Sequence, residues 1–131
     1  MLNDYIGIPF KDMGRDPVKD GGLDCWGLVR YYYLNELGIE LPEYRISSLY
    51  DLDINRLADN EIKAKGMFEI ADKPFENCIV MMKLGSRFVN HAGVLINNKI
   101  LHTYQDINSC LVAHNNPLWS RIIAYYLRFK K

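Results

Sequence analysis

The clearest hydrophobic periodicity in the chain is helical and covers residues 25–37. Apolar side chains recur there every three or four positions, which places them on one helix face: Leu28, Val29, Tyr32, Tyr33 and Leu37. Asp24 precedes this run and is a residue type that caps helices, because its carboxylate accepts hydrogen bonds from the unpaired N–H groups. Gly38 suits the left-handed residue that ends a helix, and Pro42 prevents continuation. The pattern therefore predicts a helix that begins near Cys25 and ends at Gly38.

A second, weaker amphipathic segment covers about residues 51–65, and Gly66 ends it. Its apolar positions are predicted to face inward: Leu52, Ile54, Leu57, Ala58 and Ile62. The charged positions are expected to form a solvated face: Asp59, Glu61, Lys63 and Lys65. Residues 1–23, by contrast, hold several Gly and Pro residues and are predicted to be mostly loop after Pro9.

From residue 67 onward the pattern changes to short apolar or alternating segments, which are typical of strands. Strands are expected over residues 67–70, 79–84, 88–96, 99–104, 110–113 and 122–129. Asn97 and Asn98 lie between two of them and indicate a tight hairpin turn, because Asn tolerates positive φ. Helices followed by strands predict an α+β domain over residues 1–131, with the helix that carries Cys25 packed on an antiparallel sheet.

Composition excludes several classes of protein. The chain has 131 residues, of which 49% are hydrophobic, so it can bury a core and is not a disordered segment. Its 16 basic and 16 acidic residues cancel, so no charge surplus points to nucleic acid. Three widely spaced cysteines do not form a disulfide framework, and no Cys or His pair has the spacing of metal ligands. No metal or cofactor is therefore expected.

The apolar segments are also too short for a membrane protein. None approaches the roughly 20 residues that a membrane-spanning helix needs. Residues 1–10 include Asp4 and lack the basic start and long apolar stretch of a secretory signal peptide. We therefore expect synthesis in the cytoplasm without a leader and without a membrane span.

Cys25 is the first candidate for chemistry. A thiol in the first turn of a helix is expected to be acidified, because unpaired N–H groups and the helix dipole favour the thiolate. A thiolate is the form of cysteine that acts as a nucleophile. A cysteine in a helix is nevertheless more often a small buried apolar side chain, and Cys78 and Cys110 are expected to be of that kind.

Two histidines strengthen the case for catalysis at Cys25. If the hairpin turns at Asn97-Asn98, His91 lies opposite Tyr104 and His102 lies opposite Gly93. Residues alternate between the faces of a strand, so both imidazoles are predicted to project to the same side. His91 is then the candidate base that takes the thiol proton, and His102 fixes its tautomer. The backbone N–H of Cys25 is expected to help hold an oxyanion. Each histidine alone would more often be a hydrogen-bonded strand residue, and His114 is expected at the surface.

These segments together resemble the NlpC/P60 family of cell-wall cysteine peptidases, and most closely its branch in phage tail tips and tail assembly proteins. The similarity spans almost the whole chain and rests on Gly7-Ile8-Pro9-Phe10, Gly14-Arg15-Asp16, Gly22-Leu23-Asp24-Cys25-Trp26-Gly27-Leu28-Val29, Gly38-Ile39-Glu40-Leu41-Pro42, Asn90-His91-Ala92-Gly93-Val94 through Leu101-His102, and Pro117-Leu118-Trp119 with residues 122–128. The resemblance implies a papain-like α+β fold and hydrolysis of amide bonds in peptidoglycan stem peptides.

The resemblance also implies residue roles. Cys25 corresponds to the family nucleophile, His91 to the base and His102 to the third polar residue. Three further positions correspond to substrate-binding ones: Phe10, Asp24 and Trp26. Many members have Tyr in place of Phe10 and Ser in place of Trp26, and Asp24 is either a ligand for the free amine of the stem peptide or only the helix cap.

Two other functions remain open at this point. One is a structural tail-tip or tail assembly protein with little or no hydrolase activity. The other is an amide or acyl transferase that uses the same three residues. The resemblance implies peptidoglycan and other tail-tip proteins as partners and a place in a virion tail. Arg15 and Arg30 either bind substrate carboxylates or are surface charges.

Overall fold

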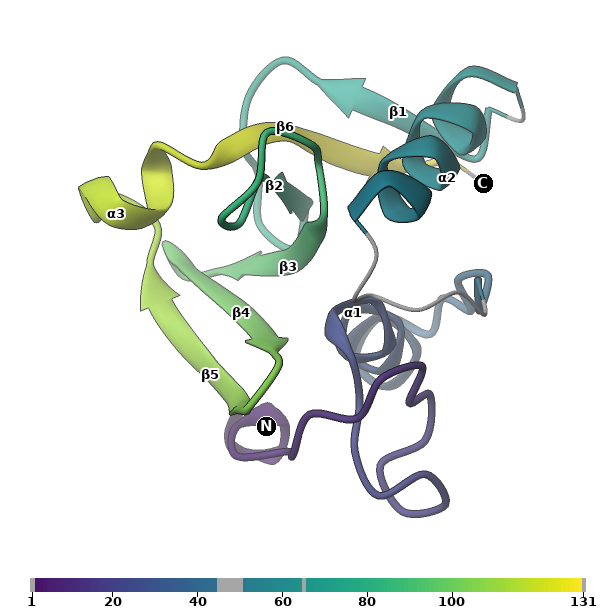
Figure 1. The fold of residues 1–131 in the computed structure, drawn as a ribbon, viewed down its shortest axis with the longest axis vertical. Coiled ribbons are helices and arrows are strands. Elements are labelled where there is room, and N and C mark those ends of the chain that lie inside the picture. Colours follow the sequence, from purple (N-terminus) through teal and green to yellow (C-terminus); the bar gives the residue numbers. More distant parts are fainter. Residues whose placement is uncertain (1, 45–50, 65, 131) are drawn as a thin grey trace.

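The structure is a computed structural model that describes residues 2–44, 51–64 and 66–130 (Figure 1). It contains one six-stranded antiparallel sheet with strand order β1-β6-β2-β3-β4-β5. The strands are β1 (Phe68–Ala71), β2 (Ile79–Met82), β3 (His91–Ile96), β4 (Lys99–Tyr104), β5 (Ile107–Ala113) and β6 (Ile123–Phe129). The helices are η1 (Leu2–Tyr5), α1 (Cys25–Tyr32), η2 (Tyr33–Leu37), α2 (Asp51–Ala64) and α3 (Pro117–Ser120). The predicted α+β class is confirmed.

The helix that carries Cys25 has the predicted boundaries. Asp24 is extended and its carboxylate accepts the Gly27 N–H, so it caps α1. The helix continues through the wider turn η2 and ends at Gly38, whose φ of 66° is left-handed. Helix α2 also lies where the pattern predicts it, although residues 45–50 of the predicted polar connection and the side chains of Leu52, Ile54 and Ile62 lie outside what the structure describes.

The strands differ from the prediction mainly at their ends. Strand β2 stops at Met82 and β3 starts at His91 because Asn90 closes the turn between them. Its side-chain amide donates to the Leu84 carbonyl at 2.8 Å and accepts the Leu84 N–H at 2.7 Å. Strand β5 starts three residues early, at Ile107, because Asp106 takes a φ of 67° and closes a tight turn after β4. Short helix α3, which was not predicted, is capped by Asn116.

Both faces of the sheet are covered, and the two histidines lie on a different face from α1. Leu28 and Val29 of α1 pack with Ala92, Val94 and Ile96 of β3. The alternate face of the central strands carries Met82, Leu95 and Ile100, against which Trp119 of α3 packs. Figure 1 shows α1 and α2 on one side of the sheet and α3 on the other. His91 and His102 alternate with the α1-facing residues, so the thiol and the histidines meet at the end of β3 rather than across one face.

Candidate active site

Cys25 is the first residue of α1, and it lies at the start of β3. Its side chain is buried, with 4% of its surface exposed. The backbone N–H groups of Ala92 and Trp26 lie near enough to the sulfur to favour its charged form, which lowers the pKa of the thiol. One cavity is lined by both Cys25 and His91. The fold therefore brings the candidate nucleophile and the candidate base to the same small space.

The thiol of Cys25 is not acidified, and that prediction was wrong. Burial and, to a smaller extent, the neighbouring Asp24 carboxylate raise the pKa of Cys25 to about 12. The Ala92 and Trp26 N–H groups oppose this shift but do not cancel it. The resting residue is therefore a neutral thiol near pH 7.

The histidine pair has the predicted geometry. Strands β3 and β4 pair Ile96 with Lys99 and Val94 with Leu101, which is the register that the Asn97-Asn98 turn implies. His91 Nε2 lies 2.9 Å from His102 Nδ1, so the two rings share one hydrogen bond. This contact leaves His91 Nδ1 as the ring nitrogen that can take a proton from Cys25.

Both imidazoles are neutral in the folded protein. Burial and, to a smaller extent, the adjacent His102 lower the pKa of His91 to about 3. Burial also lowers the pKa of His102 to about 4. A neutral imidazole carries one proton on two nitrogens, so His91 is able to act as a proton acceptor at neutral pH.

Three further residues contact the His102 ring, and the sequence pattern did not indicate these contacts. Its ring stacks on Tyr104, with centroids 5.5 Å apart and an interplanar angle of 18°. Trp119 meets it edge to face at 4.5 Å, and Cys110 Sγ lies 3.7 Å from Nε2. Cys110 is only half-buried, so its predicted burial is wrong, whereas Cys78 is fully buried as predicted. A prediction that β5 begins at Ile107 would have indicated this contact, because the β4–β5 register then places Cys110 opposite His102.

His114 is not a simple surface residue. It is half-buried, and its Nε2 lies 2.8 Å from the Tyr126 hydroxyl on β6. His114 keeps part of its surface exposed in the turn after β5, and it lies outside the cavity that Cys25 and His91 line.

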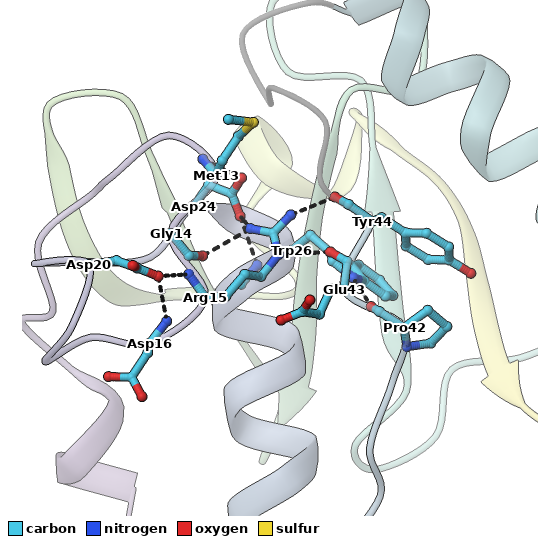
Figure 2. Close-up of polar contacts among 11 residues, drawn as sticks. Met13, Gly14, Arg15, Asp16, Asp20, Asp24, Trp26, Pro42, Glu43 and Tyr44 are labelled. Carbon is cyan, nitrogen blue, oxygen red and sulfur yellow. Dashed lines mark hydrogen bonds and ion pairs between the residues drawn. The ribbon is translucent and has the colours of Figure 1, made fainter.

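Figure 2 shows polar contacts around the Asp24 carboxylate. Its side chain is 1% exposed, and Oδ1 accepts from Gly27 N at 2.8 Å and from Arg15 Nη1 at 2.7 Å. Oδ2 accepts from Met13 N at 3.1 Å. Burial raises the pKa of the Asp24 carboxyl, and the Arg15 guanidinium and the two backbone N–H groups oppose that rise. These contacts support the interpretation of Asp24 as a helix cap.

Both arginines that were considered for substrate carboxylates are engaged within the protein. Arg15 is 6% exposed and also donates to the carbonyl oxygens of Gly14, Glu43 and Tyr44, as Figure 2 shows. Arg30 donates to the Leu41 carbonyl and lies 3.4 Å from the exposed Glu40 carboxylate. Arg15 thus joins the start of α1 to the segment that ends at Tyr44.

The cavity beside Cys25 is mainly apolar and has a volume of about 60 Å³. Its apolar lining comes from α1, the segment that ends at Tyr44, α2 and the sheet: Trp26, Tyr44, Leu57, Ala58, Phe68, Met81 and Leu127. Glu61 of α2 also lines it and accepts a hydrogen bond from the Tyr44 hydroxyl at 2.6 Å. Glu61 is therefore not part of a solvated face, which corrects the prediction for that residue. Trp26 lines the cavity as a substrate-binding residue would, whereas Phe10 lies outside it and pairs through its backbone with Leu23.

Within residues 2–44, 51–64 and 66–130, no three His, Cys, Asp or Glu side chains are grouped to hold a metal ion. In the same part of the chain, no helix is both long and apolar enough to cross a membrane.

A helix that begins with a cysteine and packs on an antiparallel sheet carrying a histidine pair defines the papain-like class of α+β folds. The sequence profile of the NlpC/P60 family matches residues 7–128. The chain therefore belongs to the NlpC/P60 family, as the resemblance predicted.

One relative in sequence and two solved structures with a similar fold can be compared with this chain. Tail tip assembly protein K of Escherichia phage N15 is 37% identical over 91 residues, which are 66% of this chain and 37% of that protein. The NlpC/p60 domain of the peptidoglycan hydrolase SagA superposes with a TM-score of 0.60 at 15% identity, covering 97% of this chain and 92% of that one. An NlpC/P60 family protein from Bacillus cereus ATCC 10987 superposes with a TM-score of 0.66 at 18% identity, covering 98% of this chain and 38% of that one.

Proposed function

We propose that this protein is a cysteine hydrolase that cleaves amide bonds in peptidoglycan stem peptides as a component of a phage tail. The observation that carries the proposal is the shared cavity of Cys25 and His91, with His102 hydrogen-bonded behind His91. Family membership supports the substrate class, and the phage N15 relative supports the tail. The virion tail, with other tail-tip proteins as partners, is part of the same proposal.

The proposed reaction proceeds through a thioester. Cys25 Sγ attacks the amide carbonyl carbon while its proton moves to His91 Nδ1. The carbon–nitrogen bond then breaks, and His91 returns the proton to the leaving nitrogen. Water next attacks the thioester and gives a proton to His91. The carbon–sulfur bond then breaks, and His91 returns that proton to the sulfur, which leaves a carboxylic acid and the regenerated thiol. The backbone N–H of Cys25 at the start of α1 is a proposed oxyanion donor.

The neutral resting state shapes this mechanism. Because the pKa of Cys25 is raised by burial and that of His91 is lowered by burial, the two side chains hold no charge before substrate arrives. Proton transfer from the thiol and attack on the carbonyl carbon are therefore expected to occur together. Trp26 is proposed to contact the substrate, since its indole ring lines the cavity and its Nε1 is fixed by the Pro42 carbonyl at 2.8 Å.

Digestion of purified peptidoglycan tests the proposal. Wild type should release stem-peptide fragments with new carboxyl and amino termini, identified by mass spectrometry, and Cys25→Ala should release none. Cys78→Ala is the matched cysteine control, because it removes a second buried thiol that does not line the cavity of Cys25 and His91, and it should still cleave. Folded wild type that leaves every stem peptide intact would overturn the hydrolase proposal.

The same experiment separates the alternatives. The curated relative is named for tail tip assembly, and this chain spans 37% of its length, which favours an assembly role as the second candidate. That role predicts no cleavage together with incorporation into tails by the Cys25→Ala variant. A transferase would instead join the acyl fragment to an added amine, so its product would carry a new amide in place of a free carboxyl group.

A further inference from the structure

His102 contacts one more polar side chain, and that contact extends the proposed catalytic relay. Cys110 projects from β5 directly opposite His102 on β4. Its sulfur lies 3.7 Å from His102 Nε2, while His102 Nδ1 faces His91 Nε2 at 2.9 Å. Each nitrogen of the His102 ring therefore has one partner, and Cys110 is the partner at the far end.

We propose that Cys110 is a positioning residue of this relay. Its sulfur accepts a hydrogen bond from His102 Nε2 while His91 holds the proton taken from Cys25. The inference rests on the proposed nucleophilic chemistry of Cys25, but it does not depend on the identity of the substrate.

The proton positions follow from the number of hydrogens that the two imidazole rings carry. When His91 has taken the Cys25 proton on Nδ1, its Nε2 is also protonated and must donate to His102 Nδ1. That nitrogen is then an acceptor, so the single proton of neutral His102 lies on Nε2. The Nε2 hydrogen points to Cys110 Sγ, which accepts it without changing its own protonation. In this arrangement every ring hydrogen that faces His91, His102 or Cys110 has a partner, and Cys110 is the acceptor at the end of the relay.

Burial makes this last acceptor important. His102 is 0% exposed, and its ring is covered by Tyr104 on one face and by the edge contact with Trp119. A buried N–H group without an acceptor costs free energy, and the cost is larger when the group belongs to a hydrogen-bonded series of side chains that carries a charge. Loss of the Cys110 acceptor should therefore destabilise the protonated relay more than the resting neutral one.

Alkylation of Cys25 by iodoacetamide measures this step without any peptidoglycan. Sγ forms a bond to the reagent carbon and iodide leaves, and the thiol proton must pass to His91 as in the proposed reaction. Cys110→Val removes the acceptor at a similar size, and Cys110→Ser keeps one. The initial rate at Cys25 is followed by mass spectrometry of its peptide, so alkylation at Cys78 or Cys110 is counted separately.

We expect Cys110→Val to slow alkylation of Cys25 at least about tenfold, since a hydrogen bond within a charged chain is worth roughly that factor or more. Cys110→Ser should stay within about threefold of wild type. The matched control is Val112→Ala, a half-buried position two residues further along the same face of β5, which should also stay near the wild-type rate. Where peptidoglycan cleavage is measurable, Cys110→Val should lower kcat and leave KM unchanged.

Circular dichroism and thermal melting establish that each variant is folded, and Cys110→Ala tests the same loss with less steric change. A folded Cys110→Val or Cys110→Ala protein that alkylates at the wild-type rate overturns the proposal. An equal loss in Val112→Ala also overturns it, because packing would then explain the effect. Failure of peptidoglycan digestion alone would count against the proposed function and not against this relay.

Discussion

Arg15 and Asp24 form the buried ion pair on which the start of the catalytic helix depends. The side chains are 4% and 1% exposed, and Arg15 Nη1 lies 2.7 Å from Asp24 Oδ1. Arg15→Met removes the guanidinium but keeps most of the apolar stem. Removal of one partner from a buried pair costs about 3–5 kcal/mol, because the other charge is left without compensation. We therefore expect the free energy of unfolding at pH 7 to fall by about that amount.

The loss of unfolding free energy caused by Arg15→Met should also depend on pH. Without the guanidinium, the pKa of Asp24 rises further above the value in the unfolded chain, since burial already raises it and Arg15 opposes the rise. A carboxyl whose folded pKa is raised favours the folded state at low pH and loses that contribution as pH rises through the folded pKa. The stability difference between wild type and Arg15→Met should therefore narrow between pH 7 and pH 5.

Urea unfolding followed by circular dichroism measures both effects. Arg30→Met is the matched control, because its partner Glu40 is 74% exposed and a surface pair contributes at most about 1 kcal/mol. Asp24→Asn combined with Arg15→Met should be less destabilised than the sum of the single changes, since the double variant leaves no buried charge. An Arg15→Met protein within 1 kcal/mol of wild type, or a difference that does not change with pH, would refute this account of the pair.

Two further predictions concern close packing and the buried histidines. A Cβ at Gly27 would lie 2.1 Å from the Gly14 carbonyl oxygen, so Gly27→Ala should cost about 3 kcal/mol or more in urea unfolding. Gly38→Ala, where a left-handed φ of 66° is the only obstacle, should cost about 1 kcal/mol, and equal losses would contradict the packing argument. Because the pKa values of His91 and His102 are lowered to about 3 and about 4, the unfolded chain binds protons first, and stability should fall as pH decreases below about 6.5. The free energy of unfolding should change by at most about 1.4 kcal/mol per pH unit for each histidine, and the change should be smaller in His102→Gln than in wild type. Equal pH dependence in wild type and His102→Gln would contradict this account of the buried histidines.

Local signals in the sequence predict much of this fold. The cap at Asp24 and the left-handed Gly38 define the helix, and both act through backbone groups within a few residues. The Asn97-Asn98 turn fixes the β3–β4 register, which places His91 and His102 within hydrogen-bond distance. These features were predictable because each depends on neighbours in the chain or on one hairpin.

Other features depend on contacts between distant segments and could not be predicted in this way. Cys110 reaches His102 only because the turn at Asp106 starts β5 early, and Trp119 reaches it only because α3 forms between β5 and β6. Glu61 faces the cavity because α2 packs beside Tyr44, and the sequence pattern of that helix indicates only that the residue is charged. Tertiary packing determines each of these contacts.

The resting charge state of Cys25 shows which of two opposing effects is larger. A helix N-terminus stabilises an adjacent anion by roughly 0.3–2 kcal/mol. Removal of a charged group from water costs several kcal/mol even after the protein has relaxed. Cys25 is 4% exposed, so the second effect exceeds the first and the pKa rises. The N–H groups of Ala92 and Trp26 favour the charged form of the sulfur, and His91 and His102 are arranged to accept the proton at that same step. The site is therefore organised for the charges that form during reaction and not for a thiolate at rest.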